Sequence, residues 1–239
     1  MNLLHLSEVG STNDYVKKNI EKLEHLTFVY SDRQTTGRGR LERKWVDFGD
    51  DNLFLTIVIK PENCDISNIS NLTQYLSVTL AMLLEDEFAL SPKIKWPNDV
   101  LINGKKVAGI LAEGTTHGST FIGLALGIGV NLNTSADKLA IIDKPATSIF
   151  NETGHHINKE LFLEKLYNKF CLLYDKYIEN GFPLIKEDYI QRAMFIGKEI
   201  TVNILGKLHT GVAEGITDEG SIILKEDDKY NTYFIGDIL

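Results

Sequence analysis

The sequence predicts an α+β protein, with a main domain of strands and helices followed by a small C-terminal β-barrel. Short β-branched or apolar runs alternate with longer segments whose apolar residues recur at helical spacing. From Gly197 onward only short alternating strands punctuated by glycine remain. With 239 residues, 43% of them hydrophobic, the chain can build one good core plus a small second domain.

The N-terminal segment predicts a strand and then a helix. Leu3 to Leu6 is a candidate strand, and Ser11-Thr12-Asn13-Asp14 is a typical helix start for a helix that continues to about Leu23. Ser11 or Thr12 is expected to cap the helix, and a helix N-terminus can also present N–H groups and hydroxyls to a polar ligand. Both interpretations can hold together.

A cluster of arginines follows the next predicted strand, Thr27 to Tyr30. Four of the five arginines of the chain lie within eleven residues of the stretch DRQTTGRGRLERKW, at positions 33, 38, 40 and 43. Gly37 and Gly39 allow backbone N–H groups to approach an anion, and guanidinium groups match phosphate and carboxylate oxygens. The alternative is a solvated basic loop. No Walker or complete Rossmann motif occurs in the chain.

The next two elements predict core packing. Asn52 to Lys60 is a nearly continuous β-branched and aromatic run, which is typical of a strand buried on both faces. A polar loop with Cys64 leads to a helix from about Ser67 to Phe88, whose leucines recur at helical spacing.

The stretch KIKWPNDVLINGKKVAGILAEG, residues 93 to 114, carries more charge than its strands should bury. It predicts a first strand that stops at Pro97 and then a hairpin turned by Asn103-Gly104. Lys95, Asp99 and Lys106 lie on or beside these apolar strands. Buried charges need partners or a ligand, so the stretch is a candidate site.

The strand Ser119 to Asn133 is rich in glycine, which indicates either close approach by a ligand or tight sheet packing. Asp137 to Gly154 is predicted to be irregular surface chain. His155-His156 lacks the accompanying residues of a metal motif. An amphipathic helix is expected over Asn158 to Glu179, followed by a shorter helix that ends near Phe195.

The C-terminal residues predict four strands, which are listed here: Glu199 to Leu205, Leu208 to Ile216, Ser221 to Lys225 and Tyr230 to Ile235. They are too few for a self-sufficient core, so a small barrel docked on the main domain is expected. We predict one domain over residues 1–195 and a second over residues 196–239.

Composition restricts the function classes. The net charge of −8 disfavours generic binding to nucleic acid or to anionic membranes. Cys64 and Cys171 show no pairing pattern, and the N-terminus has no basic segment followed by an apolar run. A cytoplasmic protein is expected.

Five motifs together resemble the biotin protein ligases. They are Ser11-Thr12-Asn13, Gln34 ahead of GRGRLERKW, KWPND at 95–99, KVAGIL at 106–111 and GIGVNLN at 127–133. The resemblance runs in order from about residue 3 to the end. It implies a catalytic domain on a mixed sheet, of the fold shared by class II aminoacyl-tRNA synthetases and biotin–lipoate ligases, with a C-terminal SH3-like barrel.

The resemblance also implies a two-step reaction. Biotin and ATP, with Mg²⁺, would give biotinyl-AMP, and a lysine of a biotin carboxyl carrier protein would then take the biotinyl group. Because the family signature begins almost at Met1, the resemblance is to the ligase-only type. DNA binding is then not expected, and neither is membrane binding, whereas a homodimer is possible.

The resemblance implies three sets of site residues. The expected catalytic residues are Lys106, Arg40 and Asp99, with Asp99 also a weak candidate for Mg²⁺ that is held mainly by the ATP phosphates. The expected biotin-binding residues are Ser11, Thr12, Asn13, Gln34, Arg38, Gly39, Arg40, Lys106, Gly109 and Leu111. The expected ATP-binding residues are Arg38, Arg40, Arg43, Trp45, Lys95, Asn98, Lys106 and Asn131.

One departure and two alternatives accompany the resemblance. Leu41-Glu42 stands where many family members have Gly-Arg, so Glu42 is expected to stiffen or partly neutralise the loop. A lipoate or octanoate ligase or transferase of the same superfamily is one alternative function. A non-catalytic biotin-binding regulatory protein is the other.

Overall fold

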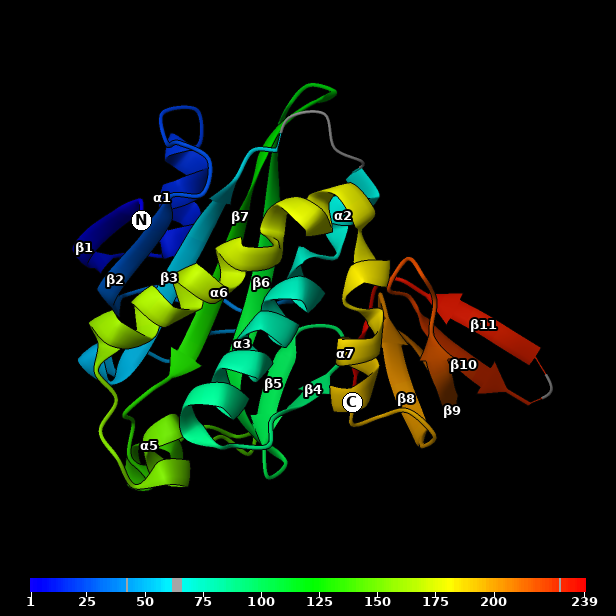
Figure 1. Cartoon of the computed structure of the whole chain (residues 1–239). Helices are drawn as coiled ribbons and strands as arrows, with labels where there is room; N and C mark the ends of the chain where they lie inside the picture. Colours follow the sequence, from blue (N-terminus) through cyan, green and yellow to red (C-terminus); the bar gives the residue numbers. More distant parts are fainter. Residues whose placement is uncertain (42, 62–65, 228) are drawn as a thin grey trace.

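The computed structural model describes residues 1–41, 43–61, 66–227 and 229–239. Two sheets organise these residues, one of seven strands and one of five (Figure 1). The larger sheet has the order β1-β2-β3-β7-β6-β5-β4 and is mixed, because β1 pairs with β2 in parallel and β2 pairs with β3 antiparallel. The predicted α+β class is therefore confirmed, with a mixed sheet and a separate antiparallel C-terminal sheet.

The elements have the following bounds. The larger sheet contains β1 (Leu3–Val9), β2 (Phe28–Gln34), β3 (Asn52–Ile59), β4 (Lys93–Lys95), β5 (Asp99–Ile102), β6 (Lys105–His117) and β7 (Thr120–Asn131). The smaller sheet contains β8 (Glu199–Ile204), β9 (Lys207–Ile216), β10 (Ile222–Glu226), β11 (Lys229–Tyr233) and β12 (Asp237–Ile238). The α-helices are α1 (Thr12–Asn19), α2 (Ile66–Ser70), α3 (Leu72–Phe88), α4 (Ala136–Leu139), α5 (Ile149–Thr153), α6 (Lys159–Asn180) and α7 (Lys186–Arg192).

Helices α3 and α6 cover one face of the larger sheet, and α1 packs on part of the other face (Figure 1). Alternation along β3 explains both contacts, since successive strand residues face opposite sides. Leu55 and Ile57 join the large core with α3 and α6, whereas Val58 joins a small cluster with Val16 of α1. All eight residues of β3 are buried, as its apolar run predicts.

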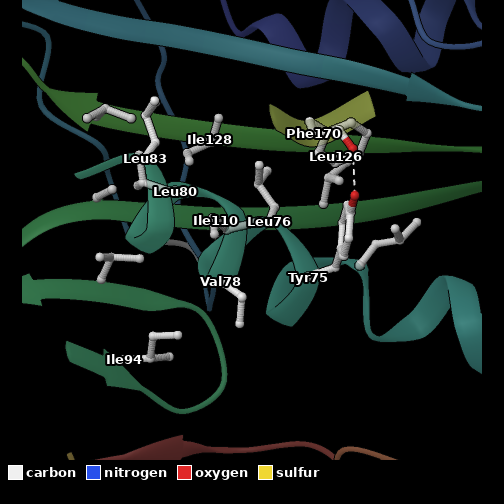
Figure 2. Close-up of a cluster of buried hydrophobic side chains, with 14 of the residues drawn as sticks. Tyr75, Leu76, Val78, Leu80, Leu83, Ile94, Ile110, Leu126, Ile128 and Phe170 are labelled. Carbon is white, nitrogen blue, oxygen red and sulfur yellow. Dashed lines mark hydrogen bonds between the residues drawn. The ribbon is translucent and has the colours of Figure 1, made fainter. Parts of the chain in front are cut away.

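The large core lies between α3, α6 and the sheet (Figure 2). Leu76 of α3 packs there beside Ile110 and Leu126 of the sheet. The hydroxyl of Tyr75 donates a hydrogen bond to the carbonyl oxygen of Phe170, at 2.5 Å, so a buried polar group finds a partner on α6. The leucine spacing of α3 and the aromatic stripe of α6 therefore serve packing.

The hairpin predicted around Asn103-Gly104 is present. Both residues have positive φ, 50° and 75°, as a two-residue turn of type I′ requires. The turn joins β5 to β6, and β4 pairs with β5 antiparallel on the other side. Three strands thus carry the charged stretch of residues 93–114.

Two predicted helix boundaries were wrong. The first helix ends at Asn19 instead of Leu23, because the chain turns back before β2 and Leu26 donates its N–H to the carbonyl oxygen of Val58. The helix expected from Ser67 is divided into α2 and α3 at Asn71, whose side chain donates to the carbonyl oxygen of Glu219 in the turn between β9 and β10. The loop with Cys64 and the position of Glu42 lie outside the described residues.

Two further segments contain more structure than expected. The stretch Asp137 to Gly154 contains all of α5 and all but the first residue of α4, and the Ser148 hydroxyl caps α5 by accepting the N–H of Asn151. The C-terminal sheet has a fifth strand, β12, which pairs with β8.

Because α7 ends at Arg192 and β8 begins at Glu199, we propose that the division at residues 1–195 and 196–239 separates two domains. Among the described helices, none combines the length and apolar character needed to cross a membrane.

Replacing Leu76 with alanine tests the core. Leu76 is fully buried, so Leu76→Ala should lower the free energy of unfolding by about 2–5 kcal/mol through lost contacts and a cavity. Leu172 of α6 is 75% exposed, and Leu172→Ala should change the same quantity by less than about 0.5 kcal/mol. Urea unfolding of both variants measures the difference, and equal effects would contradict this packing.

Candidate functional site

The candidate site lies on the face of the larger sheet opposite α3. Ile110 of β6 and Ile128 of β7 point into the core, so their neighbours Gly109 and Gly129 face the other side. These two glycines pair directly across the strands. The glycine-rich pattern of the sequence thus produces a flat floor on one face of the sheet.

A cavity of about 670 Å³ opens above this floor. Elements far apart in the sequence meet around it, from the start of α1 to strand β12. The predicted site residues all belong to its lining: Ser11, Thr12, Asn13, Gln34, Arg38, Gly39, Arg40, Arg43, Trp45, Lys95, Asn98, Asp99, Lys106, Gly109, Leu111 and Asn131. The structure therefore brings the predicted residues together, while their individual roles stay predictions.

Trp45 packs directly on the glycine floor. A Cβ atom at Gly129 would lie 2.5 Å from Cε2 of Trp45, and one at Gly109 would lie 2.9 Å from its Cζ3, so side chains there would collide with the indole. The indole Nε1 is buried and has no hydrogen-bond partner among the described residues. A buried donor without an acceptor suits a site that receives one from a ligand.

A β-bulge directs Lys106 toward the same face as Gly109. Asp99 pairs with Gly109 and Val100 with Ala108, but Leu101 pairs with Lys106, so Val107 is an extra residue in β6. Without the bulge, Lys106 and Gly109 would face opposite sides. The backbone of Lys106 is held on its other side as well, since its N–H donates to Pro145 and its carbonyl oxygen accepts from Thr147.

The Lys106 ammonium is held by two neighbours. Its Nζ lies 2.6 Å from Oδ1 of Asp99 and 5.3 Å from the centre of the Trp45 ring, within the range of a cation–π interaction. A Cβ at Gly109 would lie 2.8 Å from Nζ, so glycine allows the lysine to lie across the strand. The side chain is 32% exposed, which leaves it open to the cavity.

Lys95 adds a second ammonium group, whose pKa is lowered by its surroundings. Burial lowers the pKa of Lys95, and the positive charges of Lys144 and Lys106 lower it further. The carboxylates of Asp99 and Asp237 act in the opposite direction but do not cancel these effects. A site that concentrates positive charge in this way favours an anionic ligand.

The other end of the cavity carries neutral polar groups. The backbone N–H of Thr12 donates to Oε1 of Gln34 at 2.7 Å, which joins the start of α1 to the end of β2. Oγ1 of Thr56 lies 2.8 Å from Oγ1 of Thr12 and donates to Oδ1 of Asn13 at 2.7 Å. Ser11 caps α1, as predicted, through a long hydrogen bond of 3.5 Å from the Asp14 N–H.

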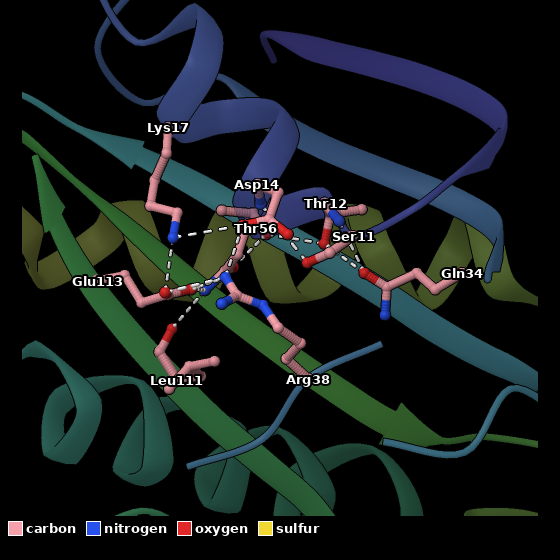
Figure 3. Close-up of polar contacts among 10 residues, drawn as sticks. Ser11, Thr12, Asp14, Lys17, Gln34, Arg38, Thr56, Leu111 and Glu113 are labelled. Carbon is pink, nitrogen blue, oxygen red and sulfur yellow. Dashed lines mark hydrogen bonds and ion pairs between the residues drawn. The ribbon is translucent and has the colours of Figure 1, made fainter. Parts of the chain in front are cut away.

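Asn13 lies flat against the sheet because β7 carries glycine beneath it. A Cβ at Gly127 would lie 2.1 Å from Oδ1 of Asn13, so alanine there would displace the amide. The amide nitrogen donates to the carbonyl oxygen of Leu111 at 3.1 Å and to Oε2 of Glu113 at 2.9 Å. Asn13 therefore connects the cavity to a charged network on β6 (Figure 3).

The arginine loop, defined here as residues 37–41 and 43–45, forms a small hairpin above the floor. The Gly39 N–H donates to the carbonyl oxygen of Arg43, and the Trp45 N–H donates to the carbonyl oxygen of Gly37. The backbones of Arg38 and Lys44 form an antiparallel β-bridge between these two contacts. Fixing one side of this hairpin therefore fixes the other.

The arginine side chains separate toward different carboxylates. Arg38 contacts Asp14 at 2.6 Å and Glu113 at 2.9 Å. Arg40 contacts Asp237 at 2.8 Å, and Arg43 lies 3.5 Å from the same carboxylate.

Two asparagines of the site have structural partners. Nδ2 of Asn98 donates to the carbonyl oxygen of Ile110 at 2.7 Å, and its Oδ1 accepts a long 3.4 Å hydrogen bond from Arg40. The Asn131 amide accepts from Asn52 at 2.8 Å and donates to the carbonyl oxygen of Thr147 at 3.0 Å. The backbone around the cavity is thus stabilised by these side chains.

Sequence reasoning missed four charged residues that shape the site. The sequence pattern assigns Asp14 only to the start of a helix, and it assigns no role to Lys17 or Glu113. Asp237 lies in the short strand β12, whose two residues carry no recognisable pattern. The spacing of Asp14 and Lys17 on one turn of α1 was the available signal for part of this network.

Among the described residues, no three His, Cys, Asp or Glu side chains gather as a metal site, and His155 and His156 are exposed. Asp99 stands as a single carboxylate beside Lys106.

Comparison with protein families gives two matches. Residues 7–131 match the model of the biotin/lipoate A/B protein ligase family. Residues 195–238 match the model of the biotin protein ligase C-terminal domain. Together the two matches include the start of α1, the arginine loop, the glycine floor and strand β12.

Three similar proteins illustrate the likeness. A biotin–[acetyl-CoA-carboxylase] ligase of Paracoccus denitrificans is 34% identical and covers 92% of each chain. The bifunctional ligase/repressor BirA of Bacillus spizizenii is 30% identical over 89% of this chain, which spans only 65% of that protein's length. The structure of a biotin protein ligase from Aquifex aeolicus with biotin and ATP matches with a TM-score of 0.86 and 26% identity, covering 100% of this chain and 97% of that one.

The pKa of Lys95 offers a test of the site's electrostatics. We expect the titration midpoint of Lys95 to lie below the ordinary value of a lysine side chain, because burial and nearby ammonium groups disfavour its charged form. Asp237→Asn removes an opposing negative charge and should lower the midpoint further. Amine labelling as a function of pH, read by mass spectrometry, measures both midpoints. A Lys95 midpoint at or above the ordinary lysine value would contradict the described environment.

Proposed function

The chain belongs to the biotin/lipoate A/B protein ligase family, and we propose that it activates biotin with ATP and transfers the biotinyl group to a lysine of a biotin carboxyl carrier protein. The match of residues 195–238 to the biotin protein ligase C-terminal domain supports biotin over lipoate or octanoate. The ligand-bound Aquifex structure and the named Paracoccus relative give the same support.

The observation that carries the proposal is the division of the cavity into a neutral and a cationic end. Thr12, Asn13 and Gln34 offer hydrogen-bonding groups at one end. Lys106 and Arg40 offer positive charge at the other. A ureido ring with a carboxylate tail fits such a gradient, because its polar neutral head and its anion need different partners.

Lys106 is proposed to bring the two anions together in the first step. An oxygen of the biotin carboxylate attacks the α-phosphorus of ATP, the new P–O bond forms, the bond to the β-phosphate oxygen breaks, and pyrophosphate leaves. Carboxylate and triphosphate repel each other, so a fixed cation between them lowers the barrier. The ammonium already lies in the cavity beside Asp99, and Arg40 and Arg43 are proposed to act on the phosphates.

Asp99 is proposed to serve the second step. The amine of the acceptor lysine attacks the acyl carbon, the amide bond forms, the bond to the phosphate oxygen breaks, and AMP leaves. Once Lys106 binds the acyl phosphate, the Asp99 carboxylate is available to orient the amine and take its proton. The positions of Lys95, Asn98, Trp45 and Asn131 around the cavity agree with a nucleotide site.

Mg²⁺ fits this site as a partner of ATP. Since the described residues provide no cluster of metal-ligating side chains, the ion would be held by the triphosphate, with Asp99 as a single protein ligand. When bound, it would neutralise phosphate charge.

The remaining proposals concern partners and location. The acceptor is proposed to be the carrier domain of a biotin-dependent carboxylase, in keeping with the name of the Paracoccus relative. A cytoplasmic location, a homodimer and the lack of DNA binding stay predictions from the sequence.

Exchange of labelled pyrophosphate into ATP tests the proposed function. With Mg²⁺ present, exchange should depend on biotin and should be weak with lipoate or octanoate at equal concentration. Exchange that prefers lipoate would favour the alternative ligase. Biotin binding without exchange would favour a regulatory protein, and either result would overturn the proposal.

Lys106→Ala should slow adenylate formation by at least about 100-fold, because one preorganised cation is lost from the transition state. Lys105→Ala is the matched control, since the neighbouring lysine is exposed and outside this cavity. Single-turnover formation of biotinyl-AMP measures both rates. A reduction below threefold in Lys106→Ala would remove Lys106 from its proposed role.

A further inference from the structure

We propose that Asp14 and Glu113 are positioning residues that clasp Arg38 and thereby hold the arginine loop over the biotin end of the cavity. This inference rests on the proposed function. It assigns Arg38 to anchoring the loop, and it leaves Arg40 and Arg43 to act on the ligand. Asp14 and Glu113 are called the acidic clasp below.

The clasp joins three elements at one guanidinium group. Nη2 of Arg38 lies 2.6 Å from Asp14 of α1 and 2.9 Å from each carboxylate oxygen of Glu113 on β6 (Figure 3). The loop is thus tied to a helix and to a strand that pack against each other without it. A single exposed ion pair would add little, but several charges in one network add more.

Other side chains hold the clasp in position. Lys17 lies 2.7 Å from Glu113 and 3.3 Å from Asp14, and Asn13 donates to Glu113 at 2.9 Å. The two acids and two bases cancel in charge, and Glu113 is only 21% exposed. The carboxylate therefore has a fixed orientation before Arg38 arrives, which reduces the entropy lost when the contact forms.

Glu113 remains ionised over a wide pH range. Burial alone would favour its neutral form, but the hydrogen bonds from Lys17 and Asn13 and the charge of Arg38 hold the pKa of Glu113 below its ordinary value. A carboxylate whose pKa is lowered in this way suits the attachment of a guanidinium group.

The clasp is connected to both sides of the cavity. Asn13 links Glu113 to Thr56 and Leu111, which belong to the neutral end. The backbones of Arg38 and Lys44 form a β-bridge across the loop hairpin. Lys44 is followed by Trp45, which packs on the glycine floor. Loss of the clasp should therefore loosen Trp45 as well as Arg38.

The opposite side of the loop has a different attachment. Arg40 and Arg43 share Asp237 of β12, and Oδ2 of Asp237 is buried with no hydrogen-bond partner among the described residues. A phosphate can replace one carboxylate there, whereas Arg38 is surrounded by two carboxylates that have their own supports. This contrast makes Arg38 the anchor of the loop.

Glu113→Gln tests the clasp, because glutamine keeps the size and shape of the side chain but removes its negative charge. Its amide oxygen can still accept the hydrogen bond from Asn13. Without ligand, trypsin should cleave after Arg40 and Arg43 about fivefold faster than in the unchanged protein, as expected when a networked ion pair is lost. The KM for biotin in pyrophosphate exchange should rise about fivefold, while kcat at saturating biotin changes less than twofold, since bound biotin itself then holds the loop.

Glu21→Gln is the matched control. Glu21 forms an exposed contact with His117 of β6, so it also joins the region after α1 to that strand but lies outside the cavity. Its loop cleavage and KM should equal those of the unchanged protein. If Glu113→Gln unfolds at a lower temperature, Asp14→Asn replaces it with the same expectations.

Unchanged cleavage in the clasp variants would overturn the inference, and so would equal acceleration in Glu21→Gln. A fall in kcat with unchanged KM would also overturn it, because the effect would then lie in the chemistry. Failure of the proposed function is a separate result: the unchanged protein would show no biotin-dependent exchange, whereas the cleavage assay would still report on the loop.

Discussion

The site depends on one cation that the sheet holds in place, the ammonium group of Lys106. A bulge at Val107 turns its side chain to the cavity face, and Asp99 at 2.6 Å and the Trp45 ring at 5.3 Å hold it there. Gly109 must lack a side chain for this arrangement, because a Cβ would lie 2.8 Å from the ammonium nitrogen. The position of the Lys106 charge therefore depends on the strand bulge and on the glycine floor together.

Around this cation, three separate parts of the chain contribute to the cavity. The start of α1 supplies neutral polar groups, the arginine loop supplies guanidinium groups, and β12 of the smaller sheet supplies Asp237. The chain as a whole carries a net charge of −8, whereas the cavity is lined by seven Lys or Arg residues and three Asp residues, a local excess of positive charge that favours an anionic ligand. Carboxylates at Asp14, Glu113 and Asp237 hold the side chains of Arg38 and Arg40 in place.

Much of this fold could be predicted from local patterns. The Asn103-Gly104 turn, the buried strand β3 and the long helices follow from turn chemistry and periodicity. The bulge at Val107 could not, because a run of apolar residues does not show where a register shifts. The division of a helix at Asn71 and the role of Asp237 depend on contacts with distant parts of the chain, which no local pattern contains.

The most direct test is a crystal structure with a non-hydrolysable sulfamoyl analogue of biotinyl-AMP. The account predicts that Nζ of Lys106 leaves Asp99 and contacts the sulfamoyl group that replaces the phosphate, with the ureido ring near Thr12 and Gln34. A structure in which Lys106 remains on Asp99 while the analogue binds without touching it would contradict the central claim.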